Sequence, residues 1–101
     1  MTSDIPLGDV PGLSVPDGVR YEVAEDIFAD LIGWCATQIA QEKSRLQPDA
    51  ARLQGWADEA AGYVAQRKAL NPQDAAGVAA VVARYAPVVR LRYPGRRTGL
   101  Q

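Results

Sequence analysis

The sequence predicts a mainly α-helical fold, a three-helix bundle formed by a single domain at residues 19–93. The composition is 48% hydrophobic and 23% charged, which is typical of a globular protein. Apolar residues recur every three or four positions through most of this region, as in amphipathic helices. Pro48 and Pro72 divide it into three segments, because the residue before a proline avoids helical dihedrals.

An extended arm is predicted at residues 1–18, before the helices. Six helix-breaking residues interrupt it: Pro6, Gly8, Pro11, Gly12, Pro16 and Gly18. Its apolar residues are Ile5, Leu7, Val10, Leu13 and Val15. This arm is too apolar for a solvated tail, so we expect Leu7, Val10 and Leu13 to contact a protein surface.

The first helix is predicted at residues 24–46. Ala24, Leu31, Cys35 and Ile39 fall on one side at helical spacing. Acidic residues lead the segment and basic residues close it, the order that the helix dipole favours.

The second helix is predicted to begin at Pro48 and to end near Leu70, with an apolar stripe that includes Leu53, Trp56 and Val64.

The third helix is predicted at residues 72–86, with Asn71 as its N-cap, Pro72 at its first position and Pro87 at its end. It is apolar nearly all round, which is typical of a central helix or of one that offers a side to a partner. We expect the partner surface to include Val78, Ala79 and Val82.

Two short segments beside the helices alternate apolar and polar residues, at 19–23 and 88–93. One interpretation pairs them as a short two-stranded sheet. The other places residues 19–23 in the first turn of the first helix and leaves residues 88–93 as an extended tail. A disordered basic tail is predicted to follow at residues 94–101.

The sequence contains no histidine and one cysteine, Cys35. Histidine-dependent catalysis and histidine zinc sites are therefore excluded, and Cys35 is predicted to be a buried core thiol. Glu22, Asp26 and Asp30 are predicted to form a solvated acidic helix face, and an enzyme using Asp26 and Asp30 is the weaker alternative. No glycine-rich phosphate loop is present, and we predict no catalytic residue, metal or cofactor.

Charge is uneven along the chain, although the net charge is only −1. Arginines gather near the C-terminus, and those predicted to contact phosphates or an acidic partner are Arg90, Arg92, Arg96 and Arg97. A sequence pI near 5.3 argues against nucleic acid as the main partner.

These observations predict a small non-enzymatic protein–protein interaction module, such as an adaptor, an assembly factor or an antitoxin-like inhibitor. It would bind a protein partner or form a homodimer through an apolar helix face and the arm. The alternative is a nucleic-acid-associated regulator that uses the arginine-rich end. The lone cysteine, the missing export signal and the lack of a long apolar run predict a cytoplasmic protein without a membrane span.

Overall fold

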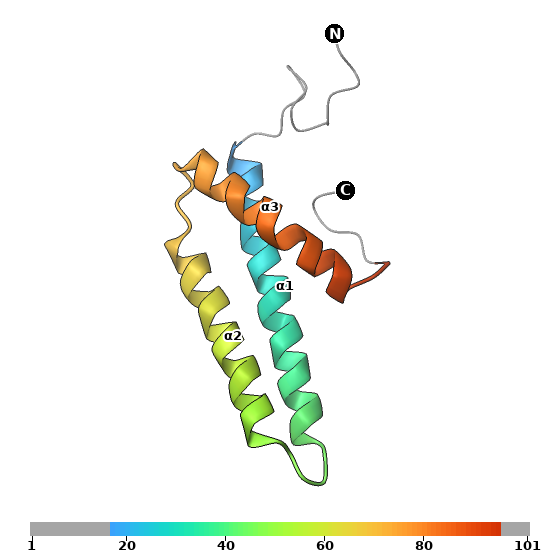
Figure 1. Ribbon diagram of the computed structural model, residues 1–101. Coiled ribbons are helices and arrows are strands. Elements are labelled where there is room, and N and C mark those ends of the chain that lie inside the picture. Colours follow the sequence, from blue (N-terminus) through green and yellow to red (C-terminus); the bar gives the residue numbers. More distant parts are fainter. Residues whose placement is uncertain (1–16, 96–101) are drawn as a thin grey trace.

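The computed structural model describes residues 17–95 and confirms a mainly α fold with three helices (Figure 1). α1 spans Asp17–Lys43, α2 spans Ala50–Ala69 and α3 spans Ala75–Arg92. Most of the predicted arm, residues 1–16, and most of the predicted tail, residues 96–101, lie outside the described residues.

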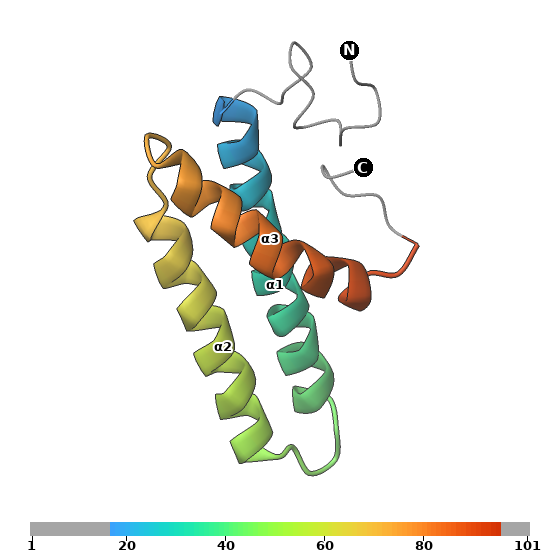
Figure 2. The ribbon, with the colours of Figure 1, turned by 45° about the horizontal axis from the view of Figure 1, so that its top comes forward.

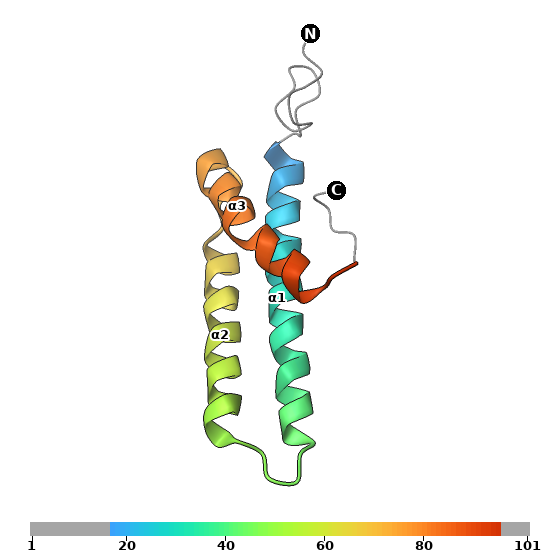
Figure 3. The ribbon, with the colours of Figure 1, turned by 45° about the vertical axis from the view of Figure 1, so that its right-hand side comes forward.

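α1 and α2 form an antiparallel hairpin, and α3 crosses α1 obliquely near the end of the hairpin that is far from the α1–α2 turn (Figures 1, 2 and 3). The backbone of α1 approaches both other helices, whereas the backbones of α2 and α3 do not approach each other. α1 is therefore the central helix, and of the two interpretations of the third helix, the one that makes it central is wrong. The reason is side-chain size, because the alanines of α3 offer less apolar area to bury than Ile27, Phe28 and Leu31 of α1.

The core lies where the three helices meet. Phe28, Leu31 and Cys35 of α1 and Val89 of α3 are fully buried, which confirms the prediction for Cys35. The rings of Phe28 and Tyr85 lie 5.5 Å apart, and Tyr63 of α2 lies 6.3 Å from Phe28. Aromatic side chains from all three helices thus hold the crossing together.

The two segments predicted as possible strands are helical, and no strand occurs in residues 17–95. Residues 19–23 belong to α1, which confirms the alternative for that segment. Residues 88–92 belong to α3, so both the strand pairing and the extended tail were wrong there. A short alternating run fits one or two helical turns as well as a strand, and tertiary contacts decide between them.

Pro87 lies inside α3 and does not end it. A proline within a helix costs about 3 kcal/mol, because its amide hydrogen is missing and its ring crowds the preceding turn. Continuing the helix buries Val89 and brings Arg92 against α2. Burial of a valine contributes about 1.5–3 kcal/mol, so these contacts offset the cost of the proline.

Asp49 and Asp74 are the N-caps of α2 and α3. The sequence had predicted that these helices begin at Pro48 and Pro72, with Asn71 as the N-cap of the third helix. The Asp49 carboxylate accepts hydrogen bonds from the amides of Ala51 and Arg52, at 2.9 and 3.1 Å, and Asp74 accepts one from Gly77 at 3.0 Å. Asn71 forms a turn instead, in which its side chain accepts from the Gln73 amide at 2.9 Å. α2 and α3 therefore begin two to three residues later than predicted, after a carboxylate that satisfies their first amides.

The α1–α2 turn depends on Glu42, which lies in the last turn of α1. Only 6% of Glu42 is exposed, and its carboxylate accepts a hydrogen bond from the Asp49 amide at 2.8 Å. Arg45 and Arg52 lie 3.3 and 3.9 Å from the same carboxylate. α1 ends at Lys43, so Leu46, predicted to belong to the first helix, lies in the turn and is fully exposed.

Candidate protein-interaction site

On the side of the hairpin that α3 covers, Arg92 joins α3 to both other helices. Its Nη2 lies 2.9 Å from Oε2 of Glu59 on α2. Its guanidinium carbon lies 5.5 Å from the ring centre of Trp34 and 5.9 Å from that of Trp56. These residues, together with Tyr63, are called the Arg92 cluster below. A guanidinium between two indole rings and beside a carboxylate is favourable by both cation–π attraction and hydrogen bonding.

Proton positions in the Arg92 cluster follow from its contacts. Burial pushes the pKa of Glu59 up, but hydrogen bonds from Tyr63 and Arg92 outweigh it and leave this pKa lowered. The Tyr63 hydroxyl donates to Glu59 Oε2 at 2.5 Å, and burial together with this bond raises the pKa of Tyr63 to about 12. Burial lowers the pKa of Arg92, but the hydrogen bond to Glu59 and the charge of its carboxylate raise this pKa by more, so the net shift is upward.

Cys35 lies against the same cluster, and burial followed by the charge of Glu59 raises the pKa of its thiol. At neutral pH the cluster therefore contains a charged pair, a neutral phenol and a neutral thiol. All four pKa shifts are directed away from neutral pH, and the contacts among these groups hold α3 against α1 and α2.

Tyr93 closes the end of α3. Its hydroxyl donates to the carbonyl of Asp30 at 3.0 Å, and its ring meets Trp34 edge-on at 5.9 Å. These contacts place Asp30 and Trp34 on the α3 side of α1.

The opposite side of the hairpin carries a groove that only α1 and α2 line. We call it the back groove, and its residues are Tyr21, Glu25, Ile32, Val64, Arg67 and Lys68, around a volume of about 420 Å³. Each residue advances about 100° around a helix, so Ile32 lies about 200° from both Asp30 and Trp34. Val64 on α2 lies about 200° from Gln66, whose side chain accepts a hydrogen bond from Tyr85 of α3. The back groove thus faces away from α3.

Apolar residues extend the back groove toward the α1–α2 turn. Ile39 follows Ile32 by seven positions, and Leu53 precedes Val64 by eleven, so both lie on the groove side of their helices. Ile32, Ile39 and Leu53 are each partly exposed, and Val64 is 38% exposed. Their rim is charged, with Glu25 on α1 and Arg67 and Lys68 on α2. The result is an apolar strip bordered by charges of both signs.

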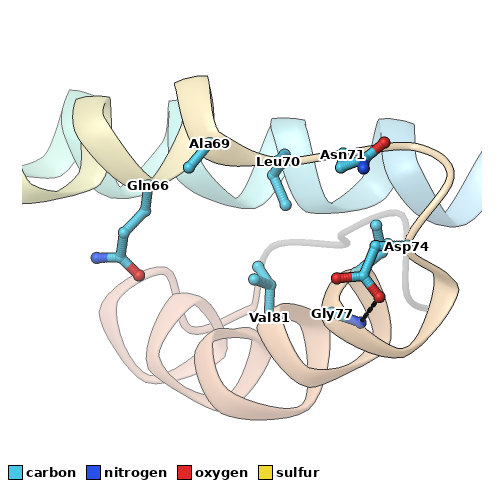
Figure 4. Close-up of a pocket in the computed structure, with 8 residues that line it drawn as sticks. Gln66, Ala69, Leu70, Asn71, Asp74, Gly77 and Val81 are labelled. Carbon is cyan, nitrogen blue, oxygen red and sulfur yellow. Dashed lines mark hydrogen bonds between the residues drawn. The ribbon is translucent and has the colours of Figure 1, made fainter.

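A second, smaller pocket lies between the end of α2 and the start of α3 (Figure 4), with a volume of about 200 Å³. Leu70 and Val81 point toward each other across it. Its one carboxylate, Asp74, already caps α3 by accepting from Gly77. The pocket is accordingly the opening left where the chain turns from α2 into α3.

The partner residues predicted on the third helix lie on its inner side and flanks. Val78 is 2% exposed, and Val82 packs against the core with part of its surface exposed. Ala79 is half-buried. The exposed side of α3 has other members: Ala76, Ala80, Ala83, Arg84, Pro87, Arg90 and Leu91.

The arginines predicted to contact phosphates or an acidic partner also differ in exposure. Arg90 is exposed, whereas Arg92 is paired with Glu59. The remaining predicted contact residues lie outside the described part of the chain: Leu7, Val10, Leu13, Arg96 and Arg97.

Sequence reasoning missed Glu59, Arg67 and Lys68 as site residues. Glu59 and Tyr63 are four positions apart, a spacing that brings side chains together on a helix, so this hydrogen bond was open to prediction. The pairing of Glu59 with Arg92 spans two helices and carried no local signal. Arg67 and Lys68 lie in the last turn of α2, where basic residues are common, and only the fold places Tyr21 and Glu25 of α1 beside them.

Within residues 17–95, no group of three or more histidine, cysteine or acidic residues is arranged to hold a metal ion. No helix in this part of the chain has the length and apolar character needed to cross a membrane. Comparisons of the chain with known protein families, curated proteins and solved structures find no match.

Proposed function

We propose that the protein is a non-enzymatic protein–protein interaction module that binds a helical segment of a partner protein in the back groove. The observation that supports this most is an apolar strip between two antiparallel helices, facing away from α3 and bordered by charges. Two helices side by side form the seat that a third helix occupies in a bundle. An adaptor, an assembly factor or an antitoxin-like inhibitor would each use such a seat.

The groove defines the partner by its chemistry. An amphipathic helix with apolar residues at positions i, i+3, i+4 and i+7 would contact Ile32, Val64 and the residues that extend the strip. Acidic side chains on its edge would lie beside Arg67 and Lys68, and a basic one beside Glu25. These rim charges would orient the partner and speed its association more than they tighten binding.

The Arg92 cluster supports this function from the opposite side. It ties α3 across the hairpin and thereby holds α1 and α2 at a set spacing. A groove whose walls are already in place loses less entropy when a partner binds.

The proposal is tested with a photo-crosslinking residue introduced at Lys68 in the native host. We expect one dominant crosslinked protein, identified by mass spectrometry. Val64→Asp in the same chain should abolish the crosslink, because it places a charge in the apolar strip. Ala65→Asp is the matched control, since Ala65 is exposed on the same helix, lies about 100° around it from Val64 and does not line the groove.

Persistence of the crosslink in the Val64→Asp chain would contradict the proposal, as would an equal crosslink from the same reagent at Ala83 on the outer side of α3. A nucleic-acid-associated role would appear instead as binding to random duplex DNA with a steep salt dependence. Arg84 and Arg90 are the exposed arginines of α3 that this alternative would use.

A further inference from the structure

We propose that residues 1–16 of the same chain occupy the back groove when the partner is absent, and so compete with the partner for it. This inference rests on the proposed function, because it gives the partner's groove an internal occupant. The arguments are reach, apolar content and charge.

Residues 1–16 are attached close enough to the back groove, and are long enough, to lie along it. α1 starts at Asp17, and Tyr21, the first groove residue, lies about one turn further along. The strip from Tyr21 to Ile39 rises about 27 Å along α1, at about 1.5 Å per residue. Sixteen extended residues span up to about 50 Å, so the segment can reverse direction at α1 and still follow the whole strip.

The apolar content of the segment suits the strip. Leu7, Val10 and Leu13 are separated by two intervening residues each, the repeat of a polyproline II helix, which would place them on one edge. Pro6, Pro11 and Pro16 favour that extended conformation and lower the entropy lost on docking. A groove between helices can accept such an edge where it would otherwise accept a helix face.

Charge favours the same pairing. Residues 1–16 carry Asp4 and Asp9 and no lysine or arginine. Arg67 and Lys68 on the groove rim form no ion pair with another residue of the described part of the chain. The exposed side of α3, the other apolar surface, presents Arg84 and Arg90 but has no second wall to hold an extended segment.

The test uses a nitroxide spin label on the full chain. Cys35 is fully buried and burial raises the pKa of its thiol, so an introduced surface cysteine reacts selectively. A label at Ala61→Cys, one turn from Val64, should cause loss of amide signal intensity for residues 5–13. A label at Ala83→Cys on the outer side of α3 is the control and should cause much less loss.

Two variants sharpen this result. Arg67→Glu with Lys68→Glu should restore the signals of residues 5–13 in the Ala61-labelled chain. Arg84→Glu with Arg90→Glu changes the net charge equally on α3 and should leave them broadened. Equal broadening from both labels, or no response to the Arg67 and Lys68 changes, overturns the proposal.

A mixed sample distinguishes docking of residues 1–16 within one chain from docking into the groove of a second copy. Isotope-labelled chains without the nitroxide, mixed with nitroxide-labelled chains without the isotope, should show no broadening of residues 5–13. Broadening in this mixture would overturn docking within one chain and assign the groove to the segment of another copy.

Different experimental outcomes would contradict this inference and the proposed function. Leu7→Asp with Val10→Asp should increase the yield of the partner crosslink at Lys68, because the competitor is removed. An unchanged yield with the crosslink still present overturns the competition and leaves the partner site intact. Specific broadening without any crosslinked partner would instead support the occupant and contradict the proposed function.

Discussion

The two sides of the α1–α2 hairpin differ in how completely their apolar residues are buried. On the side covered by α3, Phe28 and Val89 are fully buried and Arg92 is held between two indole rings and a carboxylate. On the other side, Ile32 and Val64 keep part of their surface exposed beside the charges of the rim. Both sides are lined by the same two helices.

This difference indicates that stability depends mainly on the side covered by α3, whereas the proposed binding site lies on the other side. The α3 side removes large apolar side chains from water, which is the main source of folding free energy. The back groove contributes less, because its residues are only partly buried. Substitutions in the groove should therefore lower stability only slightly, so that their effect on the proposed partner binding can be measured.

The largest expected effect comes from Phe28→Ala on the covered side. Phe28 has no exposed surface and contacts Tyr63 and Tyr85, so its truncation should lower the free energy of unfolding by about 3–5 kcal/mol. Urea denaturation followed by circular dichroism measures this. Ile32→Ala on the groove side is the control and should cost clearly less, and equal losses would mean that the two sides do not differ in stability.

The Arg92 cluster should give the next largest effect. Arg92→Ala leaves Glu59 without its cation and should cost about 2 kcal/mol, below the value for a fully buried pair because both side chains retain some exposure. Arg92 Nη1 is buried without a hydrogen-bond partner among the described residues, so part of its desolvation is uncompensated. In a double-mutant cycle of Arg92→Met, Glu59→Leu and the two together, the double variant should therefore lose clearly less stability than the sum of the two single losses. Additive losses would show that the pair is not coupled.

The pH dependence of stability should follow two of the shifted groups of this cluster, Glu59 and Tyr63. The lowered pKa of Glu59 means that its contribution is present above the unfolded-state pKa near 4.5 and is lost as the pH falls through the folded value. The raised pKa of Tyr63 means that its contribution is present below pH 10 and is lost as the pH rises through about 12. Glu59→Gln should flatten the acid limb and Tyr63→Phe the alkaline limb of the unfolding free energy. If the acid and alkaline limbs of the variants match those of the unsubstituted chain, other groups cause the pH dependence.

The smallest effect on stability is expected from Val64→Asp. Val64 is 38% exposed, so its replacement removes only part of the burial of a valine and should lower the unfolding free energy by about 1 kcal/mol. Thermal unfolding and helicity should thus stay close to those of the Ala65→Asp control. A large loss of stability from Val64→Asp would show that the back groove belongs to the core, and the contrast between the two sides would fail.

Prediction from sequence succeeded where the signal was local. Helical spacing identified three helices and placed Cys35 in the core, because a helix exposes every third or fourth residue to the same environment. The two interhelical turns were recognised from Pro48 and Pro72, although Asp49 and Asp74, not the prolines, set where the helices begin. Prediction failed at Pro87, because the contacts that offset its cost come from residues on α1 and α2.

The candidate site was less accessible to sequence reasoning than the fold. Val78 and Val82 were expected to meet a partner because the third helix is apolar nearly all round. The structure turns these two residues inward and leaves Ala76, Ala80 and Ala83 on the exposed side. An all-apolar helix contains no periodic signal that distinguishes its inner from its outer side, so only the neighbouring helices could make that distinction.

By itself, the sequence determined the helical segments, the turns between them and the absence of histidine chemistry, since these depend on the dihedral preferences and side chains of nearby residues. Tertiary structure alone decided that α1 is central, that Arg92 pairs with Glu59 and that the hairpin has one covered and one open side. The physical reason is that periodicity assigns a residue to a face of its own helix but says nothing about what lies opposite. Only the oblique crossing of α3 over α1 decides which apolar faces are buried and which remain exposed.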